Sequence, residues 1–311
     1  MKKTIKKRAF VSAIAMLIVS AIVLTSSTFA WFSMSKQATI EQMDLTVSAP
    51  DGIQISANAS AWTSSLTNDD FFNESSTSRY KAYDGNKNLL PKELCPVSSA
   101  FKQFSDGAAI FYKATLDDRG RASIITVEQK AGNDDAAGLV AFDIFFKVAA
   151  DMKVYFGTSE FTDGSNSDIL TALRVAFQPL GNVSADASAD TAVALKSTSA
   201  TTPIVYEPDS ENRSADAISA GNSTGYVATK YATSPYAAGT VNSNFVLDNG
   251  NTQSLSCKSL TDKTATTDKS FDLTAGITKM RIYVWVEGND IDCRNSVAGA
   301  VLSVALKFTI D

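Results

Sequence analysis

The sequence predicts an all-β fold, an antiparallel jelly-roll-like sandwich with a long loop-rich insert, preceded by an N-terminal hydrophobic signal helix. Three observations lead to this prediction. Apolar and polar residues alternate with period two in about ten segments. Turn signals rich in Gly, Asp, Asn and Pro separate these segments. The sequence also lacks the repeated strand–helix alternation that indicates a parallel α/β sheet.

The first thirty residues have the three parts of a secretory signal peptide. Residues 2–8 form a basic head, residues 9–24 form an apolar run, and small and hydroxylated residues follow. Thr28 and Ala30 fit the two small-residue subsites of a signal peptidase, so we place the cleavage after Ala30.

The predicted organisation is a signal peptide, residues 1–30, followed by a β-sandwich domain, residues 31–311. An uncleaved membrane helix is the alternative, because about 20 apolar residues suffice to span a bilayer. In both cases the remaining chain lies outside the cytoplasm, secreted or held at the cell surface. In the cleaved case the membrane is contacted only through residues 1–30, before cleavage.

The charge composition argues against a nucleic-acid partner. The full chain carries 28 basic and 33 acidic residues. Five of the basic residues and none of the acidic ones lie in residues 1–30, so the mature chain has a net charge of −10. Binding to nucleic acid or to an anionic membrane requires a basic surface, which this composition does not favour.

The sequence contains no histidine. This removes the histidine general base, the Ser-His-Asp and Cys-His nucleophilic pairs, and most zinc sites. We therefore expect a binding or structural protein and not an enzyme, with no catalytic residue and no required cofactor.

The first strands are expected near the start of the mature chain. Met43, Leu45 and Val47 alternate with polar residues, and Pro50-Asp51-Gly52 is a turn signal before a strand that starts at Ile53. Later strands are expected at 108–116 and 123–128, which form a hairpin, at 140–148 with a partner at 153–156, at 174–177, ended by Pro179, at 280–287 and at 300–310.

Two of these strands are expected inside a sheet. The strand 140–148 carries five large apolar residues on one face, which is typical of a central strand, and the strand 300–310 has a full apolar face up to the end of the chain. One short helix is expected at 169–173, after the capping residues 166–168. Residues 181–244 are poor in large apolar residues. We interpret them as a surface insert with short strands near 204–206 and 226–229, with partial disorder as the alternative.

An acidic turn near the C-terminus is a candidate calcium site. Glu287, Asn289, Asp290, Asp292 and Asn295 place oxygen-bearing side chains close together, and calcium takes six to eight oxygen ligands. The spacing does not match an EF-hand. A solvated hairpin turn and a sugar-contacting loop are the alternative interpretations.

Three cysteines are present in a chain that we expect to be exported, where disulfides form. Cys257 and Cys293 both lie near predicted strands in the C-terminal third and are the preferred pair. The sequence alone leaves the other pairings with Cys95 open.

Aromatic residues in a loop-rich region offer two interpretations. Trp62, Phe71 and Phe72 either stack on sugars in a binding module or attach their loop to the protein core. The second role is the commoner one for such residues.

The N-terminal region resembles the TasA/camelysin family of exported matrix-fibre proteins of Gram-positive bacteria, which carry SipW-type signal peptides. The resemblance rests on the basic head, the apolar run, the stretch 28–33, the pair Ala38-Thr39 and the strand 43–47. It implies a jelly-roll subunit whose mature N-terminus adds as a donor strand to a neighbour. Camelysin-like members have been described as metallopeptidases, but without histidine that activity is not expected here.

The function expected from residues and resemblance together is a secreted structural subunit of an extracellular fibre or biofilm matrix. Its partners would be other copies of itself, in a homopolymer, and the signal peptidase during export. The expected polymerisation segment comprises Trp31, Phe32, Met34, Ala38 and Ile40. The alternative is a cell-surface adhesin or carbohydrate-binding module, monomeric or tethered to the membrane.

Overall fold

The computed structural model describes the greater part of the chain after residue 42. The described residues are 43–72, 82–91, 94–97, 99, 109, 111–116, 122–127, 138–164, 169–196, 203–215, 244–246, 252–254, 258–261, 269–288, 290, 292–293 and 301–310. The predicted signal peptide and polymerisation segment, with Trp31, Phe32, Met34, Ala38 and Ile40, lie outside these residues. The same holds for the expected strand near 226–229.

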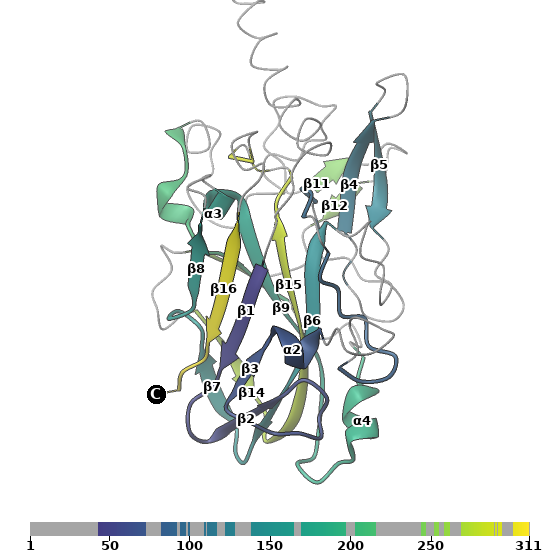
Figure 1. Cartoon of the computed structure of the whole chain (residues 1–311), viewed down its shortest axis with the longest axis vertical. Helices are drawn as coiled ribbons and strands as arrows, with labels where there is room; N and C mark the ends of the chain where they lie inside the picture. The colour runs from purple at the N-terminus through teal and green to yellow at the C-terminus, as the bar shows by residue number, and fades with distance from the viewer. Residues whose placement is uncertain are drawn as a thin grey trace, which may run out of the picture.

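Two larger sheets form the body of the molecule (Figure 1). The four-stranded sheet has the order β3 (Ser65–Thr67), β1 (Met43–Ser48), β16 (Leu302–Lys307), β8 (Glu160–Asp163). The six-stranded sheet has the order β13 (Lys258–Thr261), β10 (Ile204–Glu207), β9 (Leu173–Val183), β15 (Gly276–Val286), β6 (Leu139–Val148), β2 (Ile53–Ser56).

Three smaller sheets and four short helices complete the described structure. The two-stranded sheets pair β4 (Phe111–Leu116) with β5 (Ala122–Val127), β7 (Met152–Tyr155) with β14 (Ser270–Leu273), and β11 (Asn244–Val246) with β12 (Thr252–Ser254). The helices are α2 (Asn68–Phe71), α3 (Ile169–Ala172), α4 (Ala189–Val193) and the 3-10 turn η1 (Ser210–Asn212). Among the described helices, none has the length and apolarity needed to cross a membrane.

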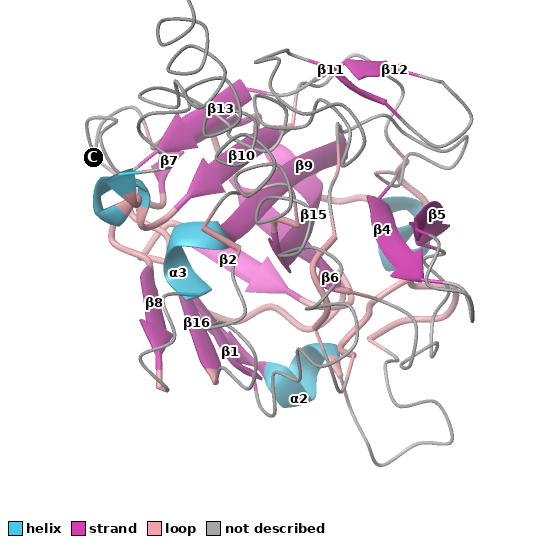
Figure 2. Cartoon of the chain, turned by 90° about the horizontal axis from the view of Figure 1, so that it is seen from above, coloured by secondary structure: helices cyan, strands magenta, loops and turns pink. Residues whose placement is uncertain are grey.

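The main core lies between the two larger sheets, so the fold is β-rich and sandwich-like (Figure 2). Leu45, Val304 and Leu306 contribute from the four-stranded sheet, while Phe142 and Ile282 contribute from the six-stranded one. The period-two alternation explains this arrangement, because every second side chain of a strand points to the same face. The prediction of an all-β protein is confirmed at this level.

A second apolar layer covers the outer face of the six-stranded sheet. Tyr283 and Trp285 of β15 point away from the main core and pack against Phe111 of β4, with ring centroids 5.3 and 5.2 Å apart respectively. Leu89 and Val97 belong to the same cluster. The strands β6 and β15 are consequently buried on both faces, as a central strand requires.

Several strand predictions are confirmed. The hairpin appears as β4 and β5, the strand 140–148 as β6 and the short helix at 169–173 as α3. The strand near 204–206 appears as β10, but it is an integral member of the six-stranded sheet and not part of a surface insert. The C-terminal strand β16 lies inside its sheet, between β1 and β8.

Other predictions were wrong. The sheets are not purely antiparallel, because β1 pairs with β16, and β10 with β13, in parallel. The segment at 153–156 is not the partner of β6: β6 has its edges occupied by β15 and β2, and β7 pairs with β14 instead. We also predicted too few helices: one short helix was expected after the signal peptide, and α2, α4 and η1 are present in addition to it.

Pro179 does not end its strand, contrary to prediction. Strand β9 continues to Val183, and its register with β15 shifts between Lys279 and Met280, where Met280 lies opposite Pro179. Proline has no backbone N–H to donate to a ladder, so it is tolerated in a sheet at a β-bulge. The strand therefore survives the proline through this local irregularity.

Candidate functional site

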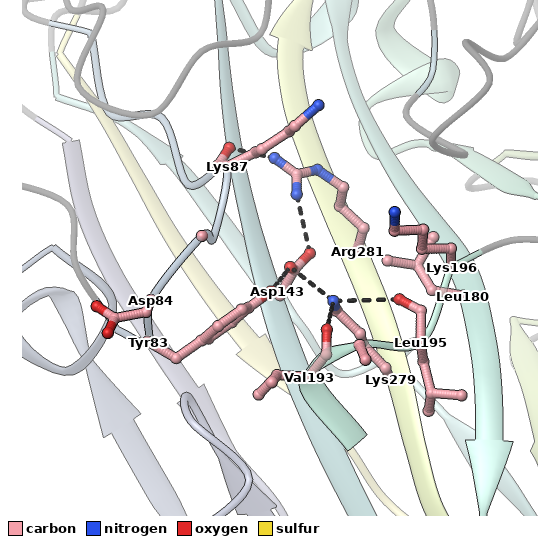
Figure 3. A pocket seen from close by; sticks show the side chains of 12 residues that line it. Tyr83, Asp84, Lys87, Asp143, Leu180, Val193, Leu195, Lys196, Lys279 and Arg281 are labelled. Carbon is pink, nitrogen blue, oxygen red and sulfur yellow. Dashed lines mark hydrogen bonds and ion pairs between the residues drawn. The ribbon is translucent and has the colours of Figure 1, made fainter. Parts of the chain in front are cut away.

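A cavity of about 440 Å³ lies on the outer face of the six-stranded sheet (Figure 3). Its floor is formed by Asp143 of β6 and by Lys279 and Arg281 of β15. One wall is the loop 83–87 and the other is the segment 193–196, which follows α4. The floor residues belong to neighbouring antiparallel strands, in which Arg281 lies directly opposite Asp143.

Asp143 is the centre of a buried polar cluster. One carboxylate oxygen accepts a hydrogen bond from the Tyr83 hydroxyl and lies 3.5 Å from Lys279 Nζ. The other oxygen accepts from Arg281 Nη1 at 3.1 Å. The exposed fraction is 1% for Asp143, 6% for Lys279 and 4% for Arg281. These charges are thus paired within the protein, as buried charges must be.

Lys279 ties the segment after α4 to the sheet. Its ammonium donates to the carbonyl oxygens of Val193 at 2.6 Å and Leu195 at 3.2 Å. Gly181 allows the close approach of this segment to β9: its φ is +143°, and a Cβ there would lie 3.0 Å from Leu195 Cδ2. Hydrogen bonds from the buried ammonium of Lys279 to these main-chain carbonyls therefore hold the segment 193–196 in place as one wall of the cavity (Figure 3).

The opposite wall is held by Arg281 and by a buried asparagine. Arg281 donates to the carbonyl oxygen of Lys87. The Asn88 side chain accepts from the Asp143 amide at 3.0 Å and donates to the Phe71 carbonyl at 3.3 Å. Each wall is thus anchored to the floor through hydrogen bonds to buried side chains.

Burial changes the protonation of two groups in the cluster. The pKa of Lys279 is lowered, mainly because burial disfavours its charged form, although the Asp143 carboxylate opposes this change. The pKa of Tyr83 is raised, first by burial and then by the charge and hydrogen bond of Asp143. Tyr83 therefore stays protonated and acts as a hydrogen-bond donor at neutral pH.

Sequence reasoning missed this cluster. Period-two alternation in the expected strands 140–148 and 280–287 assigns Asp143 and Arg281 to the strand faces opposite the main core, and the structure places them there. The sequence did contain a signal for the cluster: the acidic Asp143 and the basic Lys279 and Arg281 lie within two strands whose other residues are mostly apolar. The pairing of these strands, which brings the charges together, was not predicted.

The candidate calcium turn is built differently from the expectation. Glu287, Asp290 and Asp292 are buried, with exposed fractions of 0, 4 and 5%, so the interpretation as a solvated turn was wrong. Arg174 forms an ion pair with Asp290, and Trp285 Nε1 donates to Glu287 at 3.0 Å. Each of these carboxylates is thus engaged by the protein itself.

The turn belongs to a network that links several segments. Arg174 Nη2 also lies 3.6 Å from a Glu207 oxygen, and Arg213 Nε donates to Glu207 at 2.7 Å. The Ser214 amide donates to Asp292 at 2.9 Å. Among the described residues, no group of three or more acidic or cysteine side chains has an arrangement that would hold a metal ion. Asn289 and Asn295 lie outside the described residues, so calcium binding stays a prediction.

The cysteine and aromatic predictions have different outcomes. Cys293 is buried, and burial raises the pKa of its thiol. Cys257 lies outside the described residues, so its pairing with Cys293 stays a prediction. Phe71 and Phe72 are in the main core, as expected for residues that attach a loop. Trp62 is partly buried, with Lys147 Nζ 5.4 Å from its ring centroid.

Strand β8 presents an edge with which no described strand pairs. It ends the four-stranded sheet and bonds to β16 through its other edge. Gly164 donates from its amide to the Val301 carbonyl at 2.9 Å. Backbone groups alternate in direction along an antiparallel strand, so the N–H of Phe161 points away from β16. Its partly buried ring packs on the main core, 6.0 Å from Tyr206.

Comparisons with models of protein families, with curated proteins and with solved structures yield no match.

Proposed function

We propose that the chain is a secreted structural subunit of an extracellular fibre or biofilm matrix. In this proposal, the N-terminal segment of one copy adds as a strand to the sheet of the next copy. The observation that carries it is the outer edge of β8, with the outward N–H of Phe161 and its partly buried ring. An extended peptide gains main-chain hydrogen bonds at such an edge, and its alternate side chains fill adjoining pockets.

The proposed donor has a pattern that suits an edge strand. Phe32, Met34, Ala38 and Ile40 have even positions, so they share one face of an extended segment. Lys36 is the exception on that face. It would meet an acidic strand, because β8 contains Glu160 and Asp163. Ten residues extend over roughly 33 Å, which exceeds the length of the four-residue β8.

Short length and charged residues also protect an edge from non-specific pairing. Glu160 is already paired with Lys307 of the neighbouring strand. An edge of this kind disfavours an arbitrary exposed strand, since acidic residues brought against it would be repelled.

The sandwich is proposed to be a modified jelly roll. What supports this is the way the chain alternates between the two larger sheets from β1 to β9: β1, β3 and β8 lie in the four-stranded sheet, while β2, β6 and β9 lie in the six-stranded one. Strand exchange between two sheets is typical of jelly rolls.

Electron microscopy of purified mature protein tests the assembly proposal. Protein that starts at Trp31 should form filaments, whereas protein lacking Trp31–Gln37 should stay monomeric, because the donor is missing. Thermal unfolding of both proteins serves as the control, since residues 31–37 precede β1. Unchanged filaments in the shortened protein would contradict the donor-strand mechanism.

A second proposal is an adhesin or carbohydrate-binding module that acts as a monomer. The observation that favours it is the cavity on the six-stranded sheet, whose volume of about 440 Å³ is within the range of small-molecule sites. The two proposals use different surfaces of the sandwich and differ in the oligomeric state that they predict.

A further inference from the structure

The edge of β8 that faces away from β16 presents the backbone groups of two residues, Phe161 and Asp163. The Gly164 amide donates towards the side of β16, and directions alternate along the strand, so the N–H and C=O groups of Phe161 and Asp163 point outward. Their side chains lie on the half-buried face of β8, while Glu160 and Thr162 are exposed. A strand added here therefore has an inner face beside the first two residues and an outer face beside the last two.

One register of the leader, residues 31–42, matches the inner face of this edge. The even positions of the leader share one face, and Lys36 is the only charged residue among them. Opposite Asp163, Lys36 forms a cross-strand pair of opposite charge, which stabilises a sheet. Asp163 already has an interaction within the protein, but the two oxygens of a carboxylate accept about four hydrogen bonds, so a lysine can join it.

In the antiparallel direction the same register also suits the other residues of β8. A small side chain then meets the half-buried ring of Phe161, and polar side chains meet on the exposed face. Antiparallel pairs are also slightly more stable per residue than parallel ones. The opposing residues, in order along β8, are Thr39 with Glu160, Ala38 with Phe161, Gln37 with Thr162 and Lys36 with Asp163.

The chain is too short for a copy to fill its own edge in this way. Met43 lies level with Asp163, because both are in register with Leu302. An added strand lies three strand spacings from β1, roughly 14 Å, and Thr39 would lie at the opposite end of β8, roughly 10 Å along the strand from the level of Met43. The direct distance from Thr39 to Met43 is then about 17 Å, whereas four residues extend over about 14 Å at most.

A parallel strand is the competing arrangement, because it would end on the same side of the sheet as Met43. With Lys36 opposite Asp163, the seven residues to Met43 extend over roughly 23 Å and bridge the roughly 14 Å back to β1. A copy would then cap its own edge, and Met34 would take the place of Ala38 beside the ring of Phe161. The direction of the added strand thus decides between assembly and self-capping.

We propose that the leader adds to β8 in the antiparallel direction, with Lys36 opposite Asp163, and that its short length restricts this addition to a neighbouring copy. The inference rests on the proposed strand addition and specifies its register, its direction and its partner. Phe32 and Met34 then extend past Asp163, at the end of β8 where α3 lies (Figure 1).

Two double-cysteine variants of the mature protein distinguish the two directions. Thr162 has its backbone groups towards β16, so in the antiparallel register it forms a non-hydrogen-bonded pair with Gln37, whose Cα atoms lie about 4.5 Å apart and suit a disulfide. In the parallel register Ser35 takes the position of Gln37. We expect oxidised filaments of Gln37→Cys/Thr162→Cys to give a ladder of linked oligomers, and those of Ser35→Cys/Thr162→Cys to give at least about tenfold less.

Non-reducing electrophoresis measures the ladder, and mixing isotope-labelled with unlabelled chains before assembly shows by mass spectrometry which links join two copies. The inference is overturned if the Ser35 variant links as well as the Gln37 variant, if neither links, or if the link lies within one chain. Filaments of the unaltered protein would still support strand addition in those cases. Absence of filaments from the unaltered protein would instead contradict the proposed function itself.

Lengthening the chain between the leader and β1 tests the limit on reach. Ten Gly and Ser residues inserted after Gln42 let the leader reach its own edge, where a short flexible linker gives an effective concentration of about 1 mM, far above that of micromolar protein. We expect this variant to be monomeric by sedimentation velocity. The same ten residues placed before Trp31 are the matched control and should leave filaments intact. Filaments from the lengthened variant, or their loss in the control alone, would overturn the inference, and thermal unfolding shows that each variant is folded.

Discussion

Buried charges occur on the longest strands because the six-stranded sheet is covered on its outer face as well as its inner one. Asp143, Lys279 and Arg281 would be ordinary exposed residues of a two-layer sandwich. Loops and α4 close over them, and the same charges then become hydrogen-bond anchors for those loops. An unpaired buried charge is costly, so each member of the cluster depends on the others.

Asp290 is also a buried charged residue, and its burial makes the stability of the protein depend on pH. Burial is the largest cause that raises its pKa from 3.8 to about 6, and the neighbouring Arg174 opposes that change. A carboxyl group whose pKa is raised by folding binds its proton more tightly in the folded chain. Its contribution to stability is present below about pH 4 and is lost as the pH rises through 6.

We expect Asp290→Asn to remove this dependence, since an amide does not titrate in that range. The free energy of unfolding of the natural chain should fall relative to the variant between pH 4 and pH 6.5. Each unit of pKa difference is worth about 1.4 kcal/mol, so the relative change is on the order of 3 kcal/mol. Urea unfolding at a series of pH values measures it. Parallel profiles for the two proteins would contradict the assignment, and Asp272→Asn controls for net charge.

Individual site residues were only partly within reach of the sequence. The lack of histidine and the acidic turn were visible, and the turn does gather Glu287, Asp290 and Asp292. Their burial was not visible, because it depends on partners from distant segments, such as Arg174 for Asp290 and the Ser214 amide for Asp292. Periodicity assigns a residue to a face of its strand and does not tell what covers that face.

At the scale of elements, prediction worked for strands with strong alternation and failed for pairing partners. Strand β6 was expected from its five apolar residues, and it is present. Its partner was expected next in sequence, but the neighbours are β15 and β2, which are distant in sequence. Long-range pairing is decided by which edges fit in three dimensions, and local sequence carries little information about it.

The edge of β8 yields a prediction for assembly. Phe161→Ala and Phe161→Pro both remove the ring, and only the proline also removes the N–H that points away from β16. We expect filaments from the alanine variant and none from the proline variant. Electron microscopy and sedimentation velocity measure the difference.

This comparison separates pairing at the edge from packing of the ring. The ladder between β8 and β16 uses the other backbone groups of the strand, so both variants should show similar thermal unfolding. Filaments from the proline variant would place the acceptor elsewhere.

At the scale of the whole molecule, the fold unites the two ends of the described chain in one sheet. Strand β1, which starts at Met43, lies in parallel beside β16, which ends at Lys307. Parallel pairing requires a long connection between the two strands, and here the rest of the sandwich supplies it. Met43, where the described chain begins, therefore lies in the same sheet that exposes the edge of β8.

The overall class of fold was within reach of the sequence because alternation, turn signals and missing helices all agree. The parallel pairs and the second layer over the six-stranded sheet were not, since both depend on contacts between distant segments. Pro179 in β9 illustrates the limit: a local rule predicts a strand end there, but β9 continues to pair with β15 beyond the proline, up to Val183.

The most direct test of strand addition uses the donor as a separate peptide. A labelled peptide of residues 31–42 is titrated with protein that starts at Met43, and fluorescence anisotropy reports binding. The account predicts saturable one-to-one binding of the peptide. The protein variant Phe161→Pro should abolish this binding, and a peptide in which Phe32, Met34 and Ile40 are changed to Ser should not bind. Absence of binding, or equal binding of the altered peptide, would contradict it.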